Sequence, residues 1–187
     1  MKSPDWSNCT EEDLWKFVAW HLSKEGIEST LVGGSVVSIY SQGAYRSGDL
    51  DFIISDSDRE KIDQILLRLG FKKEGRHFVH PDCHHLFVEF PPGPLAIGSD
   101  YKIIPAKMIH QKQVLRILSP TDCVCDRLAS FIHFKTRDSL DQAVLVACSN
   151  TIDLDRIKKW CRKDNGLEQY REFLALLKKS LNETGKD

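Results

Sequence analysis

The sequence predicts an α+β protein, with a small mixed β-sheet and flanking helices followed by a C-terminal helical bundle. Short apolar segments alternate with helical patterns up to residue 118, and only helical patterns follow. The 187 residues carry a net charge of −1, with 41% hydrophobic and 28% charged side chains, which is ordinary globular composition. We expect two parts, an α/β domain over 1–118 and a helical domain over 119–187 packed against it.

The first part begins with a capping signature, Thr10 to Asp13, in which an acid follows a hydroxyl by three residues. Gly26 ends the helix that this signature starts. The following elements are a strand over 27–32, a helix over 36–41, a strand over 49–54, a helix over 59–69, and strands within 71–80, 86–90 and 115–118.

The second part begins at Ser119 with a helix-start signal. Ser119 is the N-cap, Pro120 takes the first helical position, and Asp122 is an acid in the first turn. Everything beyond this point has helical spacing. We expect helices over 120–135, 138–148, 153–163 and 167–181.

The chain has the features of a soluble cytoplasmic protein without a membrane partner. No apolar run approaches the ~20 residues that a membrane-spanning helix needs. The N-terminal residues, Met1 to Asp5, lack the apolar stretch of a signal peptide. None of the six cysteines forms a Cys-x-x-Cys pair, so we expect reduced thiols, mostly in the core.

Two acids on the second predicted strand are the first sign of chemistry. Asp49 and Asp51 lie two residues apart, so they share one face of the strand with Cα atoms about 6.5 Å apart. Like charges this close are unfavourable without a cation or a strong donor. Mg²⁺ suits the position because it accepts a few carboxylates and completes its octahedron with water and phosphates, and two-metal sites serve phosphoryl displacement.

A glycine-rich turn precedes these acids. Gly33, Gly34 and Ser35 stand where a strand turns into a helix. Glycine allows backbone to approach a phosphate closely, a helix N-terminus offers free N–H groups, and the Ser35 hydroxyl is a further donor. A phosphate cradle beside metal-binding acids describes a site for a nucleoside triphosphate.

Glu89 supplies a third carboxylate within the apolar segment Leu86 to Phe90. Burying it unpaired is costly, so it needs a metal or a cationic partner. A strand beside Asp49 and Asp51 would bring Glu89 into the same cluster, whereas the alternative is a salt bridge to a nearby lysine or arginine.

The ordered combination of these residues resembles the DNA polymerase β-like nucleotidyltransferase superfamily. That pattern is a hydrophobic residue with Gly-Gly/Ser, a gap of about ten residues and then two acids on a strand, and here it covers Leu31 to Phe52. The resemblance implies that Gly33, Gly34 and Ser35 hold the triphosphate of an NTP, and that Asp49, Asp51 and Glu89 bind Mg²⁺. The third acid would help to activate an acceptor hydroxyl.

The short chain with its helical half is similar to the minimal and abortive-infection (type IV toxin-like) branch of that superfamily. The gap of thirteen residues between Ser35 and Asp49 is long for the pattern. The implied activity is Mg²⁺-dependent transfer of a nucleoside monophosphate to a hydroxyl, with release of pyrophosphate. A catalytically silent binding module, or a toxin–antitoxin partner that needs a cognate chain, is the alternative.

Other polar residues leave two interpretations open. Arg46 precedes the acids and either contacts the nucleotide or is an exposed loop residue. A group of histidines and a cysteine invites a zinc assignment, but zinc needs four converging ligands, so a polar loop beside the active site is the favoured interpretation. That group consists of His77, His80, Cys83, His84 and His85.

Two basic clusters bear on the acceptor. One lies within 101–118, and the other within 158–163 is flanked by acids. Clustered cations attract polyanions such as tRNA, although solvated helix faces look the same. We expect an RNA or protein acceptor rather than a small antibiotic. The clusters are Lys102, Lys107, Lys112 and Arg116, and Lys158, Lys159, Arg162 and Lys163.

Overall fold

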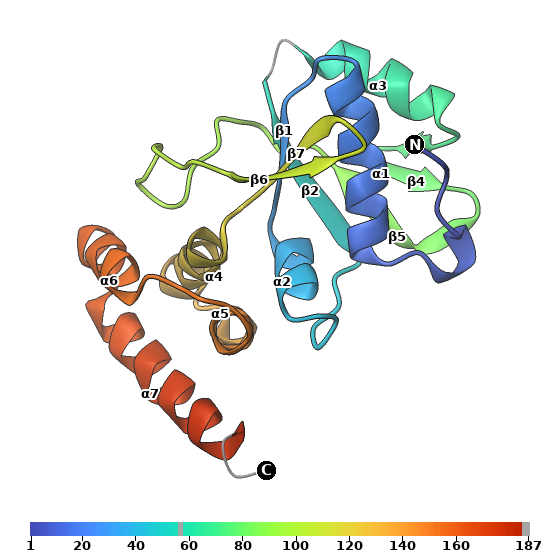
Figure 1. Ribbon diagram of the computed structural model, residues 1–187. Coiled ribbons are helices and arrows are strands. Elements are labelled where there is room, and N and C mark those ends of the chain that lie inside the picture. The colour runs from blue at the N-terminus through green and yellow to red at the C-terminus, as the bar shows by residue number, and fades with distance from the viewer. Residues whose placement is uncertain (56–57, 185–187) are drawn as a thin grey trace.

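A seven-stranded mixed sheet forms the centre of the molecule, as the computed structural model shows for residues 1–55 and 58–184 (Figure 1). The strand order is β3-β4-β5-β2-β1-β7-β6. β1 pairs with β7 and β2 with β5 in parallel, whereas the other neighbouring pairs are antiparallel. The α+β class and the C-terminal helices are therefore confirmed. The strands are β1 (Ser29–Val32), β2 (Asp49–Ile54), β3 (Lys72–Glu74), β4 (His77–His80), β5 (Cys83–Glu89), β6 (Ala106–His110) and β7 (Gln113–Ile117).

Helices pack on one face of the sheet and below one end of it. Figure 1 shows α1 running across the sheet and the helices that follow the last strand gathered beneath it. The helices are the short η1 (Trp6–Asn8), α1 (Glu11–Lys24), α2 (Gly34–Tyr40), α3 (Arg59–Arg68), α4 (Pro120–Phe134), α5 (Arg137–Ser149), α6 (Leu154–Lys163) and α7 (Leu167–Thr184).

The side chains of β2 alternate between the two faces of the sheet. Leu50 and Phe52 are fully buried and belong to the hydrophobic core. Asp49, Asp51 and Ile53 alternate with them and are only half-buried on the opposite face. The opposite face therefore remains accessible, and it carries the two acids.

Tyr40 links the helical part to the first half of the chain. The Asn150 side-chain amide donates to the carbonyl of Tyr40 at 3.0 Å, and the Tyr40 hydroxyl donates to the carbonyl of Leu118, just before α4, at 2.7 Å. α2 also contacts α4 and α5. The division into domains at residues 118 and 119 stays a prediction. In the part of the chain that the structure describes, no helix combines the length and apolarity needed to cross a bilayer.

The sequence prediction was wrong about two hairpins. The segment 71–80 holds two strands rather than one, because Gly75 turns the chain with a φ of 64°. β6 was not predicted at all, since its residues are half-buried or exposed and give no apolar segment. The turn from β6 to β7 uses Gln111 and Lys112, both with positive φ, instead of the Asn-Gly pair that signals a tight hairpin.

Candidate active site

The three predicted acids lie on neighbouring strands. β2 and β5 are parallel, and the register sets Asp51 directly opposite Glu89 and Asp49 opposite Phe87. Residues opposite each other in a ladder share a face, so Glu89 lies on the same face as Asp49 and Asp51. The end of β1 adjoins them, because Val32 pairs with Asp51. The sheet thus brings the three carboxylates and the turn after β1 to one place.

The pKa of Asp51 is strongly shifted. Its burial, followed by the negative charges of Asp49 and Glu89, raises the pKa of Asp51 to about 6. No described residue forms an ion pair with Asp49 or Asp51. The pair therefore concentrates negative charge with no cation in direct contact among the described residues, and a bound cation would relieve it.

Two serines hold Asp49 in place. The Ser47 hydroxyl lies 2.6 Å from Oδ1 of Asp49 and 3.2 Å from its carbonyl. Ser35 is completely buried, and its hydroxyl donates to the same carbonyl. The Ser35 side chain thus positions β2, and only its backbone remains for the predicted phosphate contact. Ser47 was not predicted, because a serine in a loop before a strand is a common pattern.

The glycine turn packs directly against the acids. Gly33 has a φ of 76°, and a Cβ at this position would lie 2.7 Å from Oδ2 of Asp51. A Cβ on Gly34 would lie 2.8 Å from the Ser47 hydroxyl oxygen. Side chains at either position would fill the space beside the carboxylates. Gly33 and Gly34 therefore keep backbone close to Asp51 and Ser47, and their contact with a phosphate stays a prediction.

Glu89 already has basic partners. Its Oε1 lies 2.5 Å from Nδ1 of His77, and its Oε2 lies 3.4 Å from Nε of Arg76. The His77 ring packs edge-on against Phe87, with the centroids 4.8 Å apart. Among the described residues, no group of three or more His, Cys, Asp or Glu side chains converges as a metal site. The salt-bridge alternative therefore describes Glu89 in this structure, and its role as a magnesium ligand stays a prediction.

Arg46 points to another acid. Its guanidinium is 2.9 Å from Oε2 of Glu11, while the Ser47 backbone N–H donates to Oε1 of Glu11 at 2.9 Å. The Glu11 side chain is 3% exposed and that of Arg46 is 67% exposed. Glu11 thus anchors the loop that leads into Asp49, and the predicted contact of Arg46 with nucleotide stays a prediction.

Sequence reasoning missed two charged residues that α4 contributes. Arg127 lowers and Asp126 raises the pKa of Asp51, after the larger effects of burial and the neighbouring acids. The Arg127 guanidinium donates to Asp126 at 3.0 Å through Nε and to Gln142 at 3.2 Å. Its side chain is 15% exposed. Only the packing of the helical part against the sheet reveals this cation, because the sequence separates it from Asp51 by 76 residues (127 minus 51).

The histidine and cysteine group belongs to strands and forms no described metal cluster. His77 and His80 lie on β4, and Cys83, His84 and His85 lie on β5, so the predicted polar loop is wrong. His80 is buried and stacks on Trp6 at 3.7 Å between centroids. These contacts are structural, and among the described residues this group forms no cluster of metal ligands.

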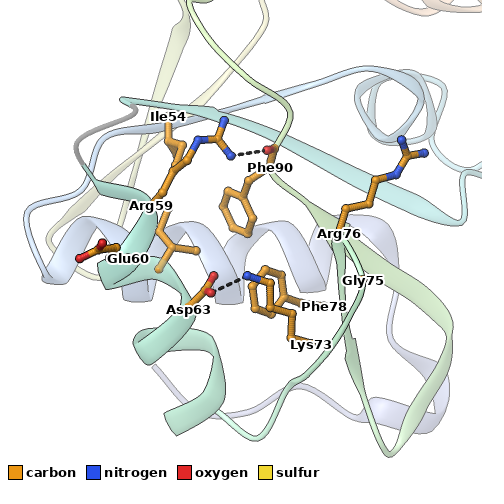
Figure 2. A pocket seen from close by; sticks show the side chains of 10 residues that line it. Ile54, Arg59, Glu60, Asp63, Lys73, Gly75, Arg76, Phe78 and Phe90 are labelled. Atoms are coloured by element: carbon orange, nitrogen blue, oxygen red, sulfur yellow. Dashed lines mark hydrogen bonds and ion pairs between the residues drawn. The ribbon is translucent and has the colours of Figure 1, made fainter.

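A separate pocket opens on the other face of the sheet. It has a volume of about 330 Å³ between α3 and the β3–β4 hairpin, and Figure 2 shows the Phe78 and Phe90 rings inside it. Arg59 donates to the Phe90 carbonyl at 3.0 Å, and Lys73 pairs with Asp63 at 2.5 Å. Phe78 pairs with Val88, which alternates with Glu89. The pocket therefore lies across the sheet from the acids.

Comparisons with known proteins agree on the fold. No family profile and no curated protein matches the chain. Among solved structures, an antigenic nucleotidyltransferase-like protein from Paracoccidioides brasiliensis aligns with a TM-score of 0.59 and 16% identity, covering 96% of this chain and 92% of that one. ANT(2'')-Ia in complex with adenylyl-2''-tobramycin aligns with a TM-score of 0.53 and 11% identity, covering 81% and 95%.

The solution structure of the antibiotic-resistance factor ANT(2'')-Ia is a further neighbour, with a TM-score of 0.50, 11% identity, and coverage of 89% and 94%. At these identities the likeness shows the fold alone. The chain has the nucleotidyltransferase-like fold, and the acids of β2 and the turn after β1 meet on the open face of its sheet.

Proposed function

We propose that this protein is a Mg²⁺-dependent nucleotidyltransferase, which transfers a nucleoside monophosphate from an NTP to a hydroxyl acceptor and releases pyrophosphate. The observation that carries the proposal is the uncompensated pair Asp49 and Asp51 packed against Gly33 on an open sheet face. The nucleotidyltransferase-like fold supports it.

The donor set of the site fits Mg²⁺. Asp49 and Asp51 are hard oxygen ligands, burial and then the charge of Asp49 raise the pKa of Asp51, and Glu89 lies opposite Asp51 on β5. Asp49 and Asp51 would hold the metal, and Glu89 would complete a two-metal site only after giving up its contacts to Arg76 and His77. When bound, Mg²⁺ supplies Lewis-acid stabilisation of charge on the phosphoryl oxygens.

The residues of the chain divide the remaining work. The backbone at Gly33 and Gly34 accommodates the phosphates, because neither position has a Cβ to exclude them. Arg127 offers a partly buried cation for the negative charge that develops on the leaving pyrophosphate. The acceptor oxygen attacks the α-phosphorus, the bond to the β-phosphate oxygen breaks, and the hydroxyl proton passes to the Glu89 carboxylate.

The acceptor we favour is RNA, including tRNA, or protein. The two basic clusters support a large anionic partner, and their residues are exposed or half-buried. A small-molecule acceptor is the second candidate, because one structural neighbour is a complex with adenylyl-2''-tobramycin. The six described cysteines are free thiols, which supports a reducing compartment such as the cytoplasm.

A catalytically silent module, or a toxin–antitoxin partner, is the competing proposal. It is favoured by the contacts of Glu89 to His77 and Arg76, which occupy the third carboxylate. Such a module would bind nucleotide or a cognate chain without turnover. Co-purification would reveal the cognate chain.

Transfer of label from the four [α-³²P]NTPs to total RNA, to protein or to tobramycin tests the proposal. We expect Mg²⁺-dependent labelling with one NTP, which disappears in Asp51→Asn. Asp63→Asn, an acid of α3 paired with Lys73, is the matched control and should retain activity. Absence of labelling in every combination would favour the silent module.

A further inference from the structure

We propose that a basic cleft along α6 binds the phosphate backbone of an RNA acceptor. The cleft lies between α4, α6 and the loop that joins β5 to β6, and we call it the α6 cleft. Its volume is about 210 Å³, and its charged lining residues are Asp100, Asp122, Arg156, Lys159 and Lys163. As a statement about the acceptor, the inference rests on the proposed nucleotidyl transfer; as a statement about RNA binding, it can be tested alone.

Cations form a continuous stripe on this side of α6. Arg156, Lys159 and Lys163 follow each other at spacings of three and four residues, which places them on one face of the helix. All three are exposed. No described acid pairs with Lys159, while Lys163 reaches only the Ser99 carbonyl at 3.4 Å. Two of the three cations are therefore available to an external anion.

The acids of the region neutralise only part of this charge. Asp122 is buried and pairs with Arg156. Asp164 is buried and is held by Ser99 and His133. Asp153 accepts from the Arg156 backbone N–H at the start of the helix. Among the described residues, four α6 cations have no acidic partner, and Asp100 and Asp155 have no cationic one; the cations are Lys158, Lys159, Arg162 and Lys163.

The wall opposite α6 is fixed in place. The Trp160 indole N–H donates to the Ile97 carbonyl at 3.1 Å, and the Ser99 hydroxyl donates to Asp164 at 2.6 Å. Gly98 fits here because a Cβ would lie 1.9 Å from the Asp164 carboxylate. The loop is thus attached to α6 at several points, and binding need not first order it.

The α6 cleft is connected to the acid site through two elements. Asp122 and Cys125 line the cleft, and one turn further along α4 come Asp126 and Arg127, which act on Asp51. The loop of the cleft continues from β5, which ends at Glu89. Figure 1 shows this loop and α6 on the same side of the molecule. The cleft and the acid site thus share α4 and the segment that follows β5.

The residues beside the stripe favour nucleic acid over an acidic polypeptide. Tyr101 is 67% exposed in the same loop, next to Lys102 and between the cleft residues Asp100 and Ile103. Exposed aromatic rings beside cations are the pattern of proteins that stack single-stranded bases while binding the backbone. Carboxylate side chains would use the lysines but not the ring.

Fluorescence anisotropy with a labelled 20-nucleotide single-stranded RNA, without NTP or metal, tests the inference. Lys159→Glu/Lys163→Glu should weaken binding about tenfold or more and reduce the salt slope by about 0.7 for each phosphate that the variant no longer neutralises. Tyr101→Ala should weaken binding about fivefold or more. Lys178→Glu/Lys179→Glu on α7 makes the same charge change at exposed positions and should retain wild-type affinity. If the charge-reversal variant has a lower melting temperature than the wild type, the test is repeated with Lys159→Gln/Lys163→Gln.

Absence of RNA binding by the wild type at low salt would overturn the inference, and so would equal loss of RNA affinity in the α6 and α7 variants. A third contrary result is displacement of RNA by poly-L-glutamate of matched charge, together with unchanged RNA affinity in Tyr101→Ala. The last would assign the surface to an acidic protein. Because the assay contains no nucleotide, a failure of transfer does not affect it. RNA binding without labelling would therefore refute the proposed reaction while upholding this surface.

Discussion

The acids of β2 and the acid of β5 lie on one face of one sheet, yet their surroundings differ. Asp49 and Asp51 contact serine and glycine and have no ion-pair partner among the described residues, whereas Glu89 contacts both Arg76 and His77. Asp49 and Asp51 therefore repel each other without an ion-pair partner, whereas the charge of Glu89 is already balanced by its basic neighbours. We infer that the β2 pair is ready for a cation and that Glu89 must exchange partners before it joins the site.

The largest expected effect comes from removing the charge of the β2 pair. Asp49→Asn and Asp51→Asn should each lower nucleotidyl transfer about a thousandfold, because metal-held charge stabilisation is worth several kcal/mol. Initial rates with labelled NTP measure the loss. A decrease of less than about tenfold in both variants would show that these acids do not hold the metal.

Alanine at Gly33 should affect both stability and the site, whereas alanine at another glycine with positive φ should affect stability alone. Gly33→Ala should lower the free energy of unfolding by about 1–3 kcal/mol, since alanine is strained at positive φ and its Cβ displaces Asp51. Gly75→Ala is the matched control, with a φ of 64° and no atom within 4 Å of the added Cβ. Urea unfolding measures both variants, and only Gly33→Ala should weaken nucleotide binding.

The negative charge of Asp51 should itself lower the free energy of unfolding. Because the pKa of Asp51 is raised to about 6, the folded state is penalised once this carboxyl ionises. Asp51→Asn should therefore raise the free energy of unfolding by about 1–2 kcal/mol at pH 7.5 in EDTA, allowing for partial exposure. The gain should shrink as the pH falls from 6 through the ordinary value of 3.8, and it should vanish at still lower pH, where the carboxyl is protonated in both states.

Urea unfolding across this pH range decides the point. Asp49→Asn is the comparison, because it removes one neighbouring charge and should lower the pKa of Asp51 only in part, since burial is the larger cause of the shift. A constant effect of Asp51→Asn at every pH would show that lost packing, rather than charge, explains the difference.

The smallest effect concerns the partners of Glu89. Arg76 is 82% exposed, so its ion pair is worth at most about 1 kcal/mol. If Glu89 binds the metal, Arg76→Ala should tighten Mg²⁺ binding by up to about fivefold in calorimetry with a non-hydrolysable NTP. Unchanged affinity in Arg76→Ala, together with unchanged affinity in Glu89→Gln, would exclude Glu89 as a ligand.

The local parts of this site could be predicted from the sequence. Alternation along β2 fixes which residues share a face, so Asp49 and Asp51 were identified from spacing alone. Glu89 was placed beside them because an acid inside an apolar segment needs a partner. The same reasoning identified most helices, since their caps and stripes are local signals.

The parts that depend on distant packing could not be predicted. Arg127 affects the pKa of Asp51 only because the fold brings α4 near β2, and Arg46 pairs with Glu11 across 35 residues of sequence. β6 lacks an apolar pattern and the β6–β7 turn lacks glycine, so β6 gave no clear signal, whereas the strand predicted over 115–118 corresponds to the end of β7. Sequence spacing thus identifies a pair of acids, and the fold determines which charges surround them.

Thermal unfolding with each of the four NTPs, with and without Mg²⁺, tests the central claim most directly. At 100 times its dissociation constant, a ligand stabilises the folded state by about 2.7 kcal/mol, which is a clear shift of the melting temperature. We expect a Mg²⁺-dependent shift with the preferred NTP that is lost in Asp49→Asn/Asp51→Asn. No shift with any nucleotide, or an equal shift in the double variant, would contradict a nucleotide site at the β2 acids.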